Sequence, residues 1–90
     1  MTYEWDETKR CRNLEKHGVD FANAKNFDWE TAFIKEDKRA DYGEDRFIAL
    51  GKIGHRLHLV AFTMRGEDVR VITLRKANAR EETLYESHQR

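Results

Sequence analysis

The chain has 90 residues, of which 39% are hydrophobic and 38% charged, and it holds two Trp, three Tyr and five Phe. This length predicts one domain with a thin core over residues 1–90, and the composition excludes a disordered tail. No long apolar run or leader pattern is present, so we expect a cytoplasmic protein without a membrane segment. A single cysteine, Cys11, excludes an internal disulfide and a thiolate zinc site.

The charges balance overall but are unevenly distributed along the chain. Lys and Arg number 17 and Asp and Glu also 17, which gives a formal net charge of 0. Residues 46–80 carry eight bases and two acids, whereas residues 28–45 carry three bases and seven acids. A local electropositive surface is sufficient for contacts with phosphate groups. Charge alone leaves open the alternative of an ordinary solvated surface.

The first 18 residues predict a short strand followed by a basic helix. Residues 2–5 alternate in character, and Asp6 is placed to cap a helix that runs to about His17. Gly18 suits the left-handed position that ends such a helix. We expect the apolar face of this helix to be buried and to carry two residues three positions apart, Cys11 and Leu14.

The following segment predicts a second short helix, a strand and a loop. Asp20 is placed to cap the helix, and Val19 before it is placed to pack onto Ala24. Residues 31–34 predict a strand. The polar residues 35–45 that follow predict an acidic loop.

From residue 46 onwards the apolar residues recur with a period of two, which predicts strands. Connections that contain glycine predict antiparallel hairpins, and hence a three-stranded meander over residues 46–51, 57–64 and 69–75. Asn78 and Glu81 resemble a capping box. This pair would open a terminal helix whose Leu84 and Tyr85 dock on the sheet.

The order of these elements predicts an α+β domain. We expect an antiparallel β-sheet with N-terminal helices and a C-terminal helix, all gathered on one face. The alternation predicts that apolar groups also occupy the other face, because two sets of opposite parity occur. These sets are Ile48, Leu50, Leu57 and Leu59 on one side and Phe62 and Met64 on the other. We expect a partner to cover part of the open face.

Any catalysis by this chain is expected to use side chains alone. The four histidines lack the spacing of metal ligands, and no Gly-rich phosphate loop precedes a helix, so we expect no metal and no cofactor. RNA cleavage can proceed in this way because the substrate supplies its own 2′-OH nucleophile. The protein then needs a base, an acid and cations for the charge of the transition state.

Several short motifs, in register over nearly the whole chain, resemble the BrnT family. They are Trp5-Asp6, Lys9, Asn13, Lys16-His17-Gly18-Val19, Phe21, Arg46-Phe47-Ile48 to Gly51, Arg70-Val71-Ile72 and Arg75-Lys76-Ala77. Thr73-Leu74 departs from the family pattern, in which Ser-Ala is more usual before the arginine.

The resemblance implies a RelE-like fold and a metal-independent endoribonuclease toxin of a type II toxin–antitoxin system, which inhibits translation. It implies RNA as the substrate and a cognate BrnA-like ribbon-helix-helix antitoxin as the partner. DNA would be bound only through this antitoxin. The toxin–antitoxin complex would repress its own operon and is compatible with a toxin dimer.

Four basic residues are the candidate catalytic groups. Arg75 ends the last predicted strand, where its guanidinium could hold the scissile phosphate through two parallel hydrogen bonds. Arg80 stands near the start of a helix, against the preference of the helix dipole, which suggests a ligand. His17 ends a helix whose dipole favours the protonated form, so it is a general acid, a phosphate contact or a simple cap. Lys16 is a phosphate contact or a solvated lysine.

Four further residues are candidates for substrate binding. Lys9, Arg46 and Lys76 could extend the phosphate track, with an ordinary surface charge as the alternative for each. Trp5 could stack on a base, with core or interface packing as its alternative. His58 is either a base for the 2′-OH or a cross-strand residue without a catalytic role.

Two other functions stay open at the level of the sequence. One is a non-catalytic nucleic-acid- or antitoxin-binding module, in which the basic segment binds phosphates or an acidic partner. The other is a purely structural dimer subunit.

Overall fold

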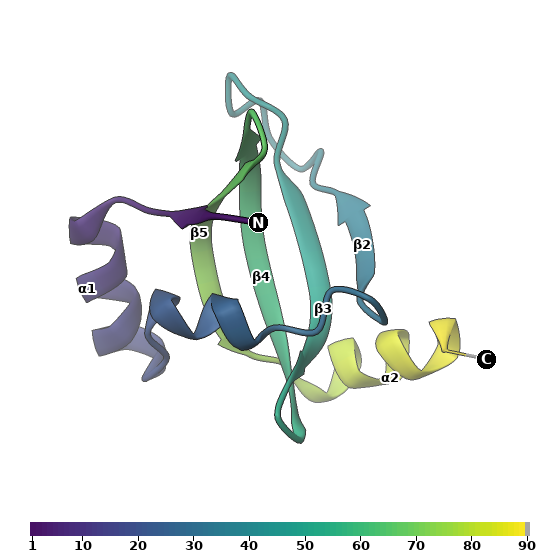
Figure 1. Cartoon of the computed structure of the whole chain (residues 1–90). Helices are drawn as coiled ribbons and strands as arrows, with labels where there is room; N and C mark the ends of the chain where they lie inside the picture. Colours follow the sequence, from purple (N-terminus) through teal and green to yellow (C-terminus); the bar gives the residue numbers. More distant parts are fainter. Residues whose placement is uncertain (90) are drawn as a thin grey trace.

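A five-stranded sheet organises the chain in the computed structural model, which describes residues 1–89 (Figure 1). The strands lie in the order β1-β5-β4-β3-β2. The elements follow one another as β1 (Tyr3–Glu4), α1 (Glu7–His17), η1 (Phe21–Asn26), β2 (Phe33–Glu36), β3 (Phe47–Ile53), β4 (Arg56–Arg65), β5 (Asp68–Lys76) and α2 (Ala79–His88). This α+β order is the one predicted from the sequence.

The predicted meander is confirmed, with strands one or two residues longer than expected. β3, β4 and β5 pair antiparallel through two-residue turns, in which Gly54 and Gly66 each adopt a φ of 62°. β2 adds to β3 antiparallel, whereas the short β1 pairs parallel with β5. The strand expected at residues 31–34 begins only at Phe33. The carboxylate of Asp28 delays it, because that side chain accepts hydrogen bonds from the backbone of Glu30 at 3.1 Å and the hydroxyl of Thr31 at 2.8 Å.

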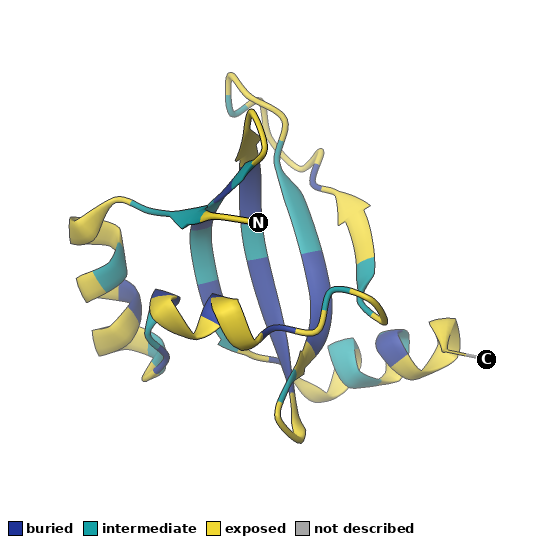
Figure 2. Ribbon diagram, viewed as in Figure 1, coloured by how far each residue is buried: buried dark blue, intermediate teal, exposed yellow. Residues whose placement is uncertain are grey.

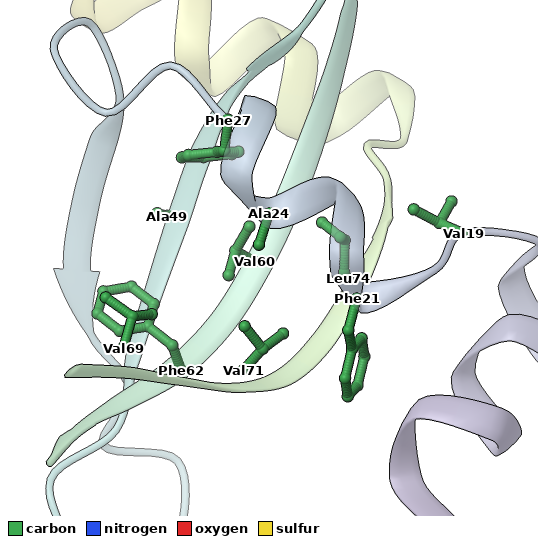
Figure 3. Packing of buried hydrophobic residues seen from close by; sticks show 10 residues of the cluster. All are labelled: Val19, Phe21, Ala24, Phe27, Ala49, Val60, Phe62, Val69, Val71 and Leu74. Carbon is green, nitrogen blue, oxygen red and sulfur yellow. The ribbon is translucent and has the colours of Figure 1, made fainter. Parts of the chain in front are cut away.

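The helices do not share one face, which corrects the expected arrangement. η1 and the Val19 segment before it cover one face of the sheet, and Figure 3 shows the ten side chains packed there: Val19, Phe21, Ala24, Phe27, Ala49, Val60, Phe62, Val69, Val71 and Leu74. The terminal helix α2 packs on the opposite face, where Tyr85 joins a smaller cluster with Leu50, Leu57, Leu59 and Ala77. The predicted parity of the strands is therefore correct. Each face has its own core because the alternation of β3 and β4 is apolar on both sides. Figure 2 shows a continuous buried stretch along each of these two strands.

The first helix has the predicted ends but a different buried face. Asp6 accepts from the backbone of Lys9 at 3.1 Å, and Gly18 ends the helix with a φ of 72°. Cys11 is exposed and Leu14 is 40% exposed, so the prediction that they are buried is wrong. The buried residue is Asn13, whose amide nitrogen donates to the carbonyl oxygens of Val19 at 3.0 Å and Leu74 at 2.7 Å.

Asn13 is buried because it completes an otherwise unpaired strand edge. β1 pairs only with Val69 and Arg70, so it does not reach Leu74 further along β5. The Asn13 side chain accepts from the Leu74 backbone N–H at 3.3 Å and donates to the Leu74 carbonyl, as a neighbouring strand would. This contact fixes α1 against β5. It also holds His17, which is one turn further along the same helix face.

The remaining caps agree with the sequence. Asp20 caps η1 by accepting from Ala22 at 3.0 Å, although the segment forms a 3₁₀ helix rather than an α-helix. Asn78 and Glu81 form both hydrogen bonds of a capping box at the start of α2. Leu84 and Tyr85 dock on the sheet as predicted.

Candidate active site

A groove of about 890 Å³ lies on the sheet face that α2 covers only in part. Its floor is apolar and consists of side chains from β3 and β4, namely Ile48, Leu50, Leu59 and Ala61. Its walls come from the end of α1, from β2 and the loop after it, from the end of β5, and from α2. A volume of this size is within the range of ligand-binding sites.

The groove brings together the four residues predicted to be catalytic. Lys16 and His17 reach it from the end of α1, Arg75 from β5 and Arg80 from the first turn of α2. These residues are up to 64 positions apart in the sequence. The fold therefore brings basic residues that are distant in the sequence together at one groove.

The four residues predicted to bind substrate do not line this groove. Lys9 and Lys76 are exposed, and Arg46 stacks on the ring of Tyr42, 4.1 Å from its centroid. Trp5 packs its ring edge-on against Phe21 with the ring centroids 6.2 Å apart. A role for these residues in RNA binding stays a prediction, and it would require RNA that extends beyond the groove.

Sequence reasoning missed other charged residues of the groove. Lys35, Lys38 and Arg39 line it, although they belong to the segment with an excess of acids. With Lys16, Arg75 and Arg80 they make six cations against three acids, Glu36, Asp37 and Glu81, which is a net charge of +3 at the groove without His17. Residues 28–45 have a negative net charge, so this average gave no indication of the three cations within the segment.

Asp37 organises the loop that supplies two of these cations. Its buried carboxylate accepts from the Arg39 side chain through two hydrogen bonds of 2.8 Å, and from the Tyr42 hydroxyl at 3.2 Å. The hydrogen bonds from the Arg39 guanidinium hold the pKa of Asp37 well below its usual range. The charged form of Asp37 therefore anchors the start of this loop beside the groove.

Arg75 is held by a carboxylate that the sequence had suggested only as a helix cap. Its Nη1 donates to Oε1 of Glu81 at 2.9 Å, and its Nη2 donates to Oε2 at 2.8 Å. Burial acts to raise the pKa of Glu81, but hydrogen bonds from Arg75 and Asn78 and the charge of Arg75 lower it overall. Glu81 is therefore a carboxylate at neutral pH.

His17 differs from its predicted protonation. Burial, followed by the charges of Lys16 and Arg75, lowers the pKa of His17 from 6.5. The helix dipole was expected to favour the protonated ring, whereas burial and two nearby cations favour the neutral ring. The lowered pKa favours the neutral imidazole, which can accept a proton.

Two further features of the described residues concern metal binding and the membrane. Within residues 1–89, His, Cys, Asp and Glu side chains form no cluster of three that could hold a metal ion. No helix in the same part of the chain is long and apolar enough to cross a membrane.

The departure from the family pattern at Thr73-Leu74 is accommodated, since Leu74 is fully buried in the first core and Thr73 lines the groove.

Comparison with known proteins agrees with the motifs. A search of curated proteins finds no match. A family model described as the ribonuclease toxin, BrnT, of type II toxin–antitoxin systems matches residues 5–81. This span begins at Trp5, ends at Glu81 and contains Lys16, His17, Arg75 and Arg80. The chain therefore belongs to the BrnT family of ribonuclease toxins of type II toxin–antitoxin systems.

Proposed function

We propose that the groove binds RNA and cleaves it as an endoribonuclease without a metal ion, and that this cleavage inhibits translation. The observation that carries the proposal is the convergence of Lys16, His17, Arg75 and Arg80 on one groove with a net positive charge. Three cations there can take over the charge stabilisation that a metal ion supplies in other nucleases.

In the proposed reaction the 2′-oxygen attacks the adjacent phosphorus and the bond to the 5′-oxygen breaks. Neutral His17 accepts the proton of the 2′-OH, and the leaving 5′-oxygen takes a proton from solvent. Arg75, with Arg80 and Lys16, stabilises the additional charge on the phosphoryl oxygens. The products are a 2′,3′-cyclic phosphate and a 5′-hydroxyl, so atoms and charges balance without a cofactor.

We further propose that a cognate DNA-binding antitoxin of the BrnA-like ribbon-helix-helix class neutralises this activity. Membership of a type II toxin family supports an antitoxin partner. DNA would then be contacted through the antitoxin. The apolar floor of the groove, with Leu50 and Leu59 beneath a basic rim, suits an amphipathic segment with acidic side chains.

Cleavage of an RNA oligonucleotide in the presence of a metal chelator tests the catalytic proposal. We expect the wild-type chain to give 2′,3′-cyclic phosphate ends, and Arg75→Ala to lower kcat by about 10²–10³-fold. Arg65→Ala is the matched control, because Arg65 is an exposed strand arginine outside the groove. RNA left intact by the wild type, together with undiminished toxicity of Arg75→Ala in cells, would contradict the proposal. RNA binding without cleavage would favour the non-catalytic module.

A further inference from the structure

Arg75 and Glu81 form an ion pair that connects the end of β5 to the first turn of α2. The side chain of Arg75 is 28% exposed and that of Glu81 18% exposed, so the pair is partly shielded from solvent. Both residues line the groove. A carboxylate at this place is unexpected, because it repels an anionic substrate and reduces the positive charge of the site.

The hydrogen bonds of the five N–H groups of the Arg75 guanidinium indicate the role of the Glu81 carboxylate. Nη1 uses one N–H on Glu81 at 2.9 Å and the other on the carbonyl oxygen of Lys76 at 3.2 Å. Nη2 uses one N–H on Glu81 at 2.8 Å. The Nε–H and the second N–H of Nη2 have no partner among residues 1–89. These two point in parallel from one side of the guanidinium and match two oxygens of a phosphate.

Glu81 is itself held in a fixed orientation. Its Oε1 accepts from the backbone N–H of Asn78 at 2.9 Å, and its own N–H donates to Oδ1 of Asn78 at 2.8 Å. The same carboxylate therefore caps α2 and engages the end of the Arg75 side chain. The orientation of the guanidinium is tied in this way to the start of a helix and to the strand that carries Arg75.

We propose that Glu81 is the positioning residue for Arg75, and that it directs the free Nε and Nη2 edge of the guanidinium towards the scissile phosphate. The proposal rests on the proposed ribonuclease function. Glu81 binds the opposite end of the fork and does not contact the reacting atoms. Its charge weakens substrate binding slightly, and its hydrogen bonds hold the catalytic geometry.

This arrangement predicts opposite effects on kcat and KM when the charge of Glu81 is removed. In Glu81→Gln the amide presents only one acceptor, so the paired contact with Arg75 is lost. We expect kcat for the RNA oligonucleotide to fall by about 10–100-fold, because small misplacements of a catalytic group have effects of this size. We expect KM to stay unchanged or to decrease, because a negative charge has left the groove.

Three further variants separate positioning from capping. Glu82→Gln makes the same charge change on the next residue of α2, which does not line the groove, and should behave as the wild type. Asn78→Ala removes the cap side chain, leaves the Arg75 pair intact, and should lower stability by about 1 kcal/mol with kcat retained. Glu81→Asp keeps the charge on a side chain too short for both contacts, and should also lower kcat.

Thermal unfolding of each variant is measured beside the kinetics, and an Arg75→Ala background completes a double-mutant cycle. We expect Glu81→Gln to cause no further loss of kcat in that background. The positioning role is overturned if Glu81→Gln keeps the wild-type kcat, or if Asn78→Ala loses as much kcat as Glu81→Gln. The ribonuclease proposal is upheld in that case when Arg75→Ala cleaves RNA slowly. Full activity of Arg75→Ala would overturn both.

Discussion

At the scale of single residues, the site depends on polar side chains in half-buried positions. His17, Asn13 and Arg10 lie on one face of α1, and the structure buries them to differing degrees although none is apolar. Arg10 pairs with Asp20 at 3.0 Å, and Asn13 pairs with β5. Arg10 therefore joins α1 to the start of η1, and Asn13 joins it to β5. His17 is delivered to the groove by these contacts.

The lowered pKa of His17 predicts how activity depends on pH. If neutral His17 accepts the 2′-OH proton, kcat/KM should rise with pH through a pKa below 6.5 and level off above it. Burial of the ring, followed by the charges of Lys16 and Arg75, lowers this pKa. A pH–rate profile of RNA cleavage measures this limb. His17→Ala should abolish the limb, and His55→Ala, an exposed turn residue, should retain it. An unchanged limb in His17→Ala would contradict the assignment.

Asn13→Ala should destabilise the protein more than a substitution in a helix at the surface usually does. The change leaves the backbone N–H and C=O of Leu74 and the C=O of Val19 without their partner in a buried region. Unsatisfied buried groups cost about 1–3 kcal/mol each, so we expect the free energy of unfolding to fall by about 3 kcal/mol. Urea denaturation checks this value. Leu14→Ala on the exposed side of α1 should change it by less than about 1 kcal/mol, and equal losses would disprove the role of Asn13.

At the scale of elements, one close contact sets the position of η1 and the chain after it. Phe27 follows η1 and packs over Gly51 of β3, while Asp28 donates its backbone N–H to the Lys52 carbonyl at 2.9 Å. A Cβ at Gly51 would lie 2.5 Å from the ring of Phe27. Glycine is required here because of this approach of a ring to the strand backbone.

Gly51→Ala should therefore lower stability by about 1–3 kcal/mol through overpacking, as measured by thermal or urea unfolding. The ring of Phe27 must move, because the backbone carbonyl oxygen of Asp28 also lies only 3.0 Å from the added Cβ. Phe27→Leu in the Gly51→Ala background should recover part of the loss. Two additive effects in this double-mutant cycle would show that the contact with Phe27 is not the cause.

At the scale of the whole molecule, the fold determines where the charged side chains gather. The net charge of the chain is 0, whereas the groove carries six cations against three acids. The cations come from α1, β2 with its following loop, β5 and α2. A chain with no net charge therefore has a groove of net positive charge, which suits contacts with phosphate groups.

This charge predicts a measurable dependence of RNA binding on salt. With about three phosphates neutralised, the logarithm of the association constant should fall with the logarithm of salt concentration with a slope of about −2. Binding of an oligonucleotide with 2′-deoxy residues, which cannot be cleaved, is the suitable measurement. Lys35→Ala with Lys38→Ala should reduce the slope by about 1. The pair Lys25→Ala and Lys52→Ala, exposed and outside the groove, should leave it unchanged.

The sequence by itself determined the local structure of this protein. The caps at Asp6, Asp20 and Asn78, the turn at Gly18 and the period of two from residue 46 depend on neighbouring residues, so they could be predicted from the chain. The BrnT motifs and the candidates Arg75 and His17 were equally visible. The burial of Cys11 and Leu14 was predicted wrongly, because periodicity cannot show that a strand edge needs the amide of Asn13.

Only the tertiary structure decided how these parts form a site. Placement of α2 on the face opposite η1 creates the groove, and strand order brings residues from both ends of the chain to it. The low pKa of His17 and the contact between Glu81 and Arg75 depend on desolvation and on distances between elements. Such quantities arise from packing in three dimensions, which motif spacing along the chain does not contain.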